Sequence, residues 1–201
     1  MKEIKNLLKE LTKFDAPSGR ERELSLFLEN YLKENGFETD IDYFGNVAGR
    51  LKNSEGKKIL LTAHIDQILF YVTKIDKNYI LIDTRMADKK ILKGKEVILV
   101  TEKGKFKGII GMTPPHIKNK DEKDYLYIDT GLLTPEEAGV KPGDPVLFSS
   151  EFKELSENIC AGRSFDNRAS VSVLLDLARE LKDINFKGEI IFNPSLDEII
   201  E

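Results

Sequence analysis

The chain has 201 residues, of which 40% are hydrophobic and 33% charged, so it can bury one sizeable core or two small ones. Its 31 basic and 35 acidic residues give a net charge of −4, and no basic run interleaved with aromatic residues occurs, which argues against a nucleic-acid partner. The single cysteine, Cys160, excludes an intrachain disulfide and a zinc site built from several cysteines, and it favours a reducing, cytoplasmic location.

Two amphipathic helices are expected at the start of the chain, followed by two strands. Residues 2–13 and 21–35 carry apolar side chains at i, i+3 and i+4 spacing, and residues 16–19 form a turn between them. The first segment alternates charged with apolar residues, unlike a signal peptide or a membrane span, so no membrane partner is expected. Strands are predicted at residues 46–51 and 58–63; the second is almost wholly apolar, which is typical of an interior strand covered on both faces.

The pattern changes between residues 69 and 157, where short β-rich segments alternate with turns. This pattern indicates a small β-barrel or sandwich. After it, residues 167–182 have helical periodicity and residues 189–193 form another apolar strand. The expected fold class is α/β: an α/β domain of residues 1–67 and 158–201, interrupted by an inserted small β-barrel domain of residues 68–157. The short strands are predicted at residues 70–75, 79–83, 97–102, 106–111, 125–129 and 145–149.

Polar residues follow two of the predicted strands of the α/β part. His64 and Asp66 come directly after one apolar strand, and Asp197 and Glu198 follow the strand at residues 189–193. Because open α/β sheets bind ligands at the carboxyl ends of their strands, we expect these side chains at the same edge of the sheet. In extended geometry His64 and Asp66 lie on one face, so Asp66 can hold the second ring nitrogen of a metal-bound imidazole.

A third candidate is Asp166, which directly precedes a predicted helix and can bridge cations there. Each candidate also has a plain structural interpretation. His64 can be a hydrogen-bonded strand-end histidine, Asp166 a helix N-cap, and Asp197 with Glu198 a solvated acidic end. His116, in a turn of the β insert, is expected to be structural. Spacing alone therefore leaves a metal site and these structural roles open.

Several segments, in this order, resemble a known family. AHIDQILF is similar to AHMDEIGF, and GRSFDNRAS to GKALDDRxG; GIIGMTPPHI and the later AGVKPGDPV resemble GVIGxKPPHx and GIxPGDPV. LLKELTKFDAPSGRERE and FGNVAGRL match as well. The family is the M42 group of metallo-aminopeptidases, which includes TET and glutamyl aminopeptidases and members described as cellulase-like. The resemblance covers essentially the whole chain.

The resemblance implies a zinc-peptidase-like α/β domain that hydrolyses N-terminal residues from a peptide substrate. It implies two divalent ions, zinc or cobalt, with His64 as a ligand of one ion, Glu198 as a ligand of the other and Asp166 bridging both. Asp66 matches the family's His-supporting Asp. Asp197 stands where the family has its general-base Glu, which takes a proton from the attacking water. The β insert corresponds to the domain that family members use for assembly, so a homo-oligomer is expected.

Some positions depart from the family pattern. Asp197 is one methylene shorter than the family's Glu, and Gln67 and Leu69 replace Glu and Gly. The family's further Asp and His ligands have no counterpart up to Glu201, so each ion would keep two protein ligands where a catalytic zinc usually has three, and weak zinc binding is expected. Two functions stay open: an aminopeptidase of which these residues are one portion, and a non-catalytic assembly or binding subunit of the same family.

Overall fold

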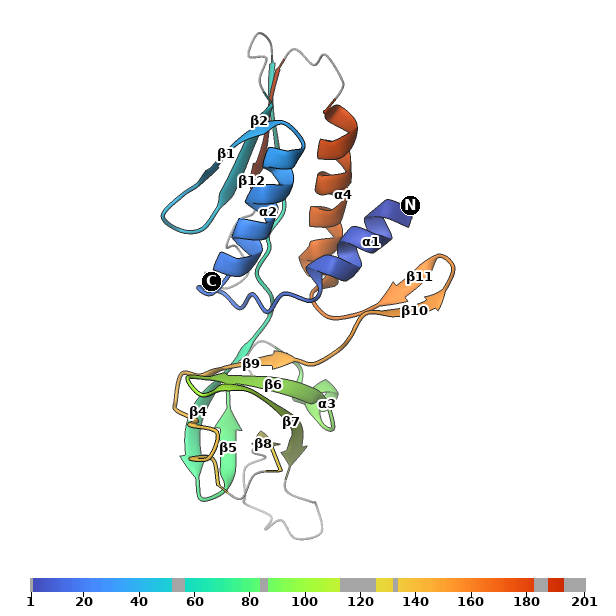
Figure 1. Ribbon diagram of the computed structural model, residues 1–201. Helices are drawn as coiled ribbons and strands as arrows, with labels where there is room; N and C mark the ends of the chain where they lie inside the picture. Colours follow the sequence, from blue (N-terminus) through green and yellow to red (C-terminus); the bar gives the residue numbers. More distant parts are fainter. Residues whose placement is uncertain are drawn as a thin grey trace. The chain divides into compact units, whose positions relative to one another are not determined.

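The computed structural model describes residues 2–51, 57–83, 87–112, 126–131, 134–182 and 188–193. The chain divides into two compact units, one of Met1–Gln67 with Glu151–Glu201 and one of Ile68–Ser150 (Figure 1). The first boundary lies where the sequence pattern changes. The second lies after Ser150, whereas the sequence suggested a boundary after residue 157.

Three helices of the first unit form one layer. They are α1 (Lys2–Leu11), α2 (Arg22–Glu34) and α4 (Phe165–Leu181), and Figure 1 shows α2 and α4 running side by side along the sheet. Each helix buries one apolar stripe, as the helical spacing predicted. These stripes and the facing sheet residues form one core: Leu7, Leu11, Ala16, Leu24, Leu28, Leu32, Phe37, Val47, Ala63, Ile65, Val171, Leu175 and Ala178.

The sheet of the first unit has the order β1-β2-β12-β3, with β1 at Phe37–Ile41, β2 at Val47–Leu51, β3 at Lys57–Thr62 and β12 at Gly188–Asn193. Strand β2 pairs antiparallel with β1 and β12, whereas β3 and β12 run parallel, with Thr62 opposite Asn193. The prediction that these two strands are neighbours is confirmed. The prediction of an interior β3 is wrong for the described strands, because β3 lies at the edge of the sheet and Leu60 is 59% exposed.

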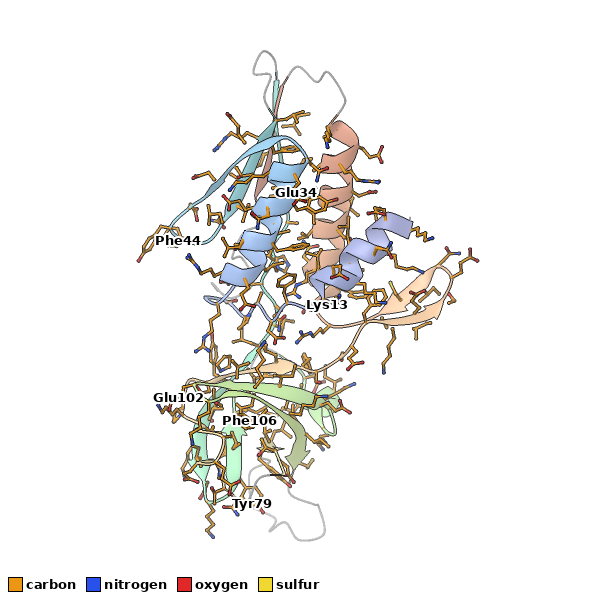
Figure 2. All side chains as sticks on the ribbon, viewed as in Figure 1. Lys13, Glu34, Phe44, Tyr79, Glu102 and Phe106 are labelled. Carbon is orange, nitrogen blue, oxygen red and sulfur yellow. The ribbon has the colours of Figure 1, made fainter. Side chains whose placement is uncertain are left out.

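The turn between β1 and β2 is held by Asp42. Its Oδ1 accepts hydrogen bonds from the backbone N–H groups of Phe44 and Asn46, each at 2.9 Å, and Gly45 adopts a left-handed φ of +92°. Such a side-chain-stabilised turn fixes the register of the two strands. Tyr43 and Phe44 are exposed there, and Figure 2 shows Phe44 pointing away from the helices.

The hairpin of β10 (Lys153–Ser156) and β11 (Ile159–Ala161) also belongs to the first unit. Its strands have no buried face to produce an apolar alternation, which explains why the sequence did not predict them. Lys5 of α1 forms an ion pair with Glu154 of the hairpin at 2.7 Å.

The second unit is a closed β-barrel, which settles the barrel-or-sandwich alternative. Its strands follow one another around the barrel in the order β4-β5-β8-β7-β6-β9. A short helix, α3 (Lys89–Leu92), begins after Asp88, whose side chain accepts a hydrogen bond from the N–H of Lys90. The strands are β4 (Phe70–Asp76), β5 (Tyr79–Ile82), β6 (Glu96–Thr101), β7 (Gly104–Met112), β8 (Leu126–Asp129) and β9 (Pro145–Phe148).

The barrel has its own core, separate from that of the first unit. Alternate residues of its strands point inward, as the period of two along a strand requires. The fully or nearly buried core residues are Phe70, Val72, Ile80, Ile82, Leu92, Val97, Leu99, Ile110, Leu126, Ile128, Ala138, Val140 and Val146.

None of the helices in the described part of the chain has a stretch both long and apolar enough to cross a membrane.

Candidate functional site

The segment that follows β3 carries the first candidate residues. Ala63 and Ile65 are buried in the core of the first unit, and this burial anchors the backbone on both sides of His64. The side chain of His64 itself is 14% exposed. The strand end therefore holds an imidazole at the margin of the packed region.

Asp66 contacts His64 and is fully buried. Its Oδ1 lies 3.2 Å from His64 Nδ1, and its Oδ2 accepts a hydrogen bond from the hydroxyl of Ser18 at 2.6 Å. Both carboxylate oxygens are therefore engaged, and the Asp66 side chain has 0% exposure. A buried carboxylate held at both oxygens fixes the orientation of the imidazole that it contacts.

Asp166 contacts the other ring nitrogen of His64. Its Oδ1 lies 3.2 Å from His64 Nε2, although the two residues are 102 positions apart in the sequence. The Asp166 side chain is 80% exposed. The structure therefore brings His64, Asp66 and Asp166 together.

The backbone around Asp166 departs from a regular helix. Helix α4 begins at Phe165 with Ser164 as its N-cap residue, and Asp166 itself has φ −84° and ψ 106°. The peptide bond between Asp166 and Asn167 is cis. The contact described for the Asp166 carboxylate is the one with His64, and not a hydrogen bond that caps α4.

A buried arginine lies beside these residues, and the sequence analysis did not single it out. Arg168 is fully buried, and its guanidinium donates to the carbonyl oxygens of Leu11 (2.6 Å) and Phe14 (2.7 Å) and to Gln67 Oε1 (3.0 Å). One signal was available: Arg168 precedes Val171 by three positions and so lies on the apolar stripe of α4. A charged residue on such a stripe needs buried partners.

The charge of Arg168 persists despite its burial. Burial lowers the pKa of Arg168 to about 10, and the charge of Arg163 acts in the same direction, while Asp15 and Asp66 raise it. The guanidinium therefore stays protonated at neutral pH. Arg163 itself pairs with Asp15 and donates from Nε to the carbonyl oxygen of Thr12 at 3.2 Å.

The remaining predicted residues, Asp197, Glu198 and His116, lie outside the described residues. Within the described ranges, no group of three or more His, Cys, Asp or Glu side chains is arranged to hold a metal ion. The arrangement that is described consists of one imidazole between two carboxylates. An imidazole nitrogen and a carboxylate oxygen in contact are donors that zinc and similar divalent ions take.

Comparisons with known proteins give consistent results. The model of the M42 glutamyl aminopeptidase family matches residues 45–200. A lysyl aminopeptidase of Pyrococcus furiosus is 31% identical over 162 residues, which cover 75% of this chain and 46% of the relative. The crystal structure of a TET aminopeptidase from the archaeon Thaumarchaeota archaeon SCGC AB-539-E09 superposes with a TM-score of 0.89 at 30% identity, covering 99% of this chain and 59% of that one.

A second solved structure, the TET1 peptidase of Pyrococcus horikoshii, has a TM-score of 0.82 at 30% identity and is described as able to assemble into a tetrahedron or a large octahedral shell. The match covers 62% of the chain in that structure and 98% of this chain. The chain spans about half the length of the curated relatives it matches.

Proposed function

Because the chain belongs to the M42 glutamyl aminopeptidase family, we propose that it provides part of the site of a metal-dependent aminopeptidase. The substrate class is peptides, from which the N-terminal residue is hydrolysed. Two divalent ions, zinc or cobalt, would supply Lewis-acid activation of water and of the scissile carbonyl when bound. The observation that carries this proposal is the 3.2 Å contact between His64 Nε2 and Asp166 Oδ1.

The donor chemistry of this contact fits a divalent ion. Two ligands of one tetrahedral zinc ion, each bound at about 2.0–2.2 Å, lie about 3.4 Å apart. The separation of 3.2 Å between His64 Nε2 and Asp166 Oδ1 is close to that value. Both atoms offer lone pairs, so the contact needs a proton or another cation between them. We therefore assign His64 and Asp166 as metal ligands.

The other residues have roles around that pair. Asp66 holds the imidazole of His64 through Nδ1 and keeps Nε2 directed at Asp166. Asp197 is proposed as the general base that accepts the proton of the attacking water, and Glu198 as the ligand of the second ion; support for both comes from the family pattern. Asp197 is one methylene shorter than a glutamate, and a general base has to come within hydrogen-bond distance of the water whose proton it accepts.

The barrel unit of Ile68–Ser150 is proposed as an inserted assembly domain, corresponding to the β insert of residues 68–157 in the sequence. In this proposal the protein is a cytoplasmic homo-oligomer. The assembly described for the TET1 peptidase of Pyrococcus horikoshii supports this. The alternative function is a non-catalytic assembly or binding subunit. It is favoured by Asp197 and Gln67, which stand where the family pattern has glutamates.

Zinc binding tests the assignment of His64. The chain has 2 histidines, so His116→Ala is a matched control for His64→Ala. Titration calorimetry with zinc should show weak binding to the unchanged chain and to His116→Ala, and none to His64→Ala. Equal binding by all three proteins would contradict the metal assignment.

Peptidase assays separate the two functions. Release of a chromogenic amine from aminoacyl substrates, with added zinc or cobalt, should be little or none for the 201 residues alone. Supplying the family's further Asp and His ligands on a C-terminal segment should complete three protein ligands for each ion and produce turnover that His64→Ala abolishes. If the chain supplied with this C-terminal segment forms oligomers but shows no turnover, the result would support the function of a non-catalytic subunit.

A further inference from the structure

A buried side-chain network joins the two segments that carry His64 and Asp166. Its centre is Gln67, which is 2% exposed and follows His64 by three residues. The amide oxygen of Gln67 accepts hydrogen bonds from Ser164 Oγ and from Arg168 Nη2, both at 3.0 Å. The two donors stand two residues before and two residues after Asp166, so one oxygen holds the chain on both sides of this carboxylate.

The position of Gln67 is itself fixed by the backbone. Its N–H donates to the carbonyl oxygen of Ala16 at 3.1 Å, and it forms an isolated parallel bridge with Pro17. Arg168 is fixed in the same region, because its other terminal nitrogen donates to the carbonyl oxygens of Leu11 and Phe14. The network therefore connects the end of α1, the segment after β3 and the start of α4.

Asp166 depends on such anchors more than a core residue does. Its side chain is 80% exposed, so packing contributes little to its position. Its backbone, and that of Asn167, has non-helical dihedral angles, and the backbone hydrogen bond that closes this turn runs from the N–H of Arg168 to the carbonyl oxygen of Ser164 at 3.2 Å. The side chains of Ser164 and Arg168, which flank Asp166 in the sequence, both donate hydrogen bonds to Gln67 Oε1.

We infer that Gln67 is a positioning residue, whose amide oxygen sets the distance between His64 Nε2 and Asp166 Oδ1. It acts through Ser164 and Arg168 and touches no reacting atom. A buried amide suits this role because it accepts two hydrogen bonds at a single oxygen without adding a charge. The inference deepens the proposed function, since the pair it positions is the assigned metal-ligand pair. Its main test needs no metal, so the two can fail separately.

The test measures the imidazole of His64 in the metal-free chain. Nitrogen-15 NMR reports the hydrogen bonding of each ring nitrogen, and with 2 histidines in the chain the signals are assigned by His116→Ala. Asp166→Ala defines the Nε2 signal without the carboxylate contact. Gln67→Leu should move the Nε2 signal towards that reference and leave the Nδ1 signal, which reports Asp66, unchanged. Gln67→Glu keeps an acceptor oxygen for Ser164 and Arg168 and should keep the original Nε2 signal.

Two further variants guard against a mere loss of folding. Ser164→Ala removes one of the two donors and should shift the Nε2 signal in the same direction by a smaller amount. Ser25→Ala removes another hydrogen bond of the first unit, from Ser25 Oγ to the carbonyl oxygen of Gly45, and should leave the signal unchanged. An Nε2 signal that stays unchanged in Ser164→Ala and in folded Gln67→Leu, or that does not respond to Asp166→Ala, would overturn the inference.

Zinc titration then connects the network to the proposed function. Gln67→Leu should weaken zinc binding by about 10-fold or more, the size of effect typical of residues that support metal ligands, and Gln67→Glu should bind like the unchanged chain. If the NMR signals shift as expected but the chain binds no zinc, the positioning role is retained and the metal site is rejected. If Gln67→Leu binds zinc with the same affinity as the unchanged chain, and its NMR signals are also unchanged, the positioning role alone is rejected.

Discussion

His64 contacts two carboxylates in opposite environments. Asp66 has 0% side-chain exposure and is held by Ser18, whereas Asp166 is 80% exposed. An interaction with a buried carboxylate is screened little by water and salt, while one with an exposed carboxylate is screened strongly. The contact at Nδ1 is therefore screened less by water and salt than the contact at Nε2.

We expect Ser18→Ala to destabilise the first unit by about 1–3 kcal/mol, because it leaves one oxygen of a buried carboxylate without its donor. Hydrogen exchange at the amides of α4 gives the free energy of opening of this unit. Ser25→Ala, which loses a hydrogen bond between neutral groups, should cost about 1 kcal/mol. A Ser18→Ala variant as stable as the unchanged chain would show that Asp66 does not need this donor.

Glu21 predicts a pH dependence of stability. Burial raises the pKa of Glu21 above its ordinary value of 4.5, with Asp66 adding to the rise and backbone hydrogen bonds, including the one from Gly19 N–H, opposing it. The folded state then keeps the proton at a higher pH than the unfolded state, so the contribution of Glu21 to stability falls as pH rises through the raised value. Glu21→Gln should therefore gain stability relative to the unchanged chain as pH rises from below the ordinary pKa of Glu21 through its raised value.

Glu154 serves as the control for this prediction, because its pKa is shifted the other way. The hydrogen bond from Lys5 lowers the pKa of Glu154, so its contribution is present at higher pH and is lost as pH falls. Glu154→Gln should lose stability relative to the unchanged chain as pH rises, by a small amount because the pair is exposed. Equal pH slopes for the two variants, measured by hydrogen exchange, would contradict the assignment of Glu21.

At the scale of elements, the packing of α2 on β2 depends on a close approach at Gly49. A Cβ atom at Gly49 would lie 2.8 Å from Leu32 Cδ1, and Leu32 is a buried core residue of α2. Because Gly49 has no Cβ atom, the side chain of Leu32 has room where α2 packs on β2. An added methyl group here overpacks a dense interior.

We expect Gly49→Ala to destabilise the first unit by about 1–3 kcal/mol because Leu32 has to move. The measurement is a double-mutant cycle, with hydrogen exchange at the amides of β2. In a Leu32→Ala background the added methyl group finds space, so Gly49→Ala should then cost little or even stabilise. A cost that is the same in both backgrounds would show that the strand backbone, and not Leu32, limits the substitution.

At the scale of the whole molecule, each of the two units buries its own core, and the two cores share no residue. Ile128 belongs to the barrel core and Leu175 to the core of the first unit. Ile128→Ala and Leu175→Ala should each cost about 2–5 kcal/mol within their own unit, because each leaves a cavity. Hydrogen exchange should show lost protection in β6 for the first variant and in α2 for the second. Loss of protection across the whole chain in either variant would indicate a single cooperative unit.

The sequence by itself determined the features that depend on neighbouring residues. Helical and strand periodicity located α2, α4 and β4 to within a few residues, and the spacing of His64 and Asp66 placed both side chains on one face because extended chains alternate with a period of two. Strands without a buried face, such as β10, gave no such pattern.

Only the tertiary structure decided which distant groups meet. Arg168 is buried because the carbonyl oxygens of Leu11 and Phe14 and the amide of Gln67 surround it, and Asp166 faces His64 because Ser164 and Arg168 are tied to that same amide. No local pattern encodes these contacts, since the cost of burying a charge is offset by acceptors that lie more than a hundred residues away.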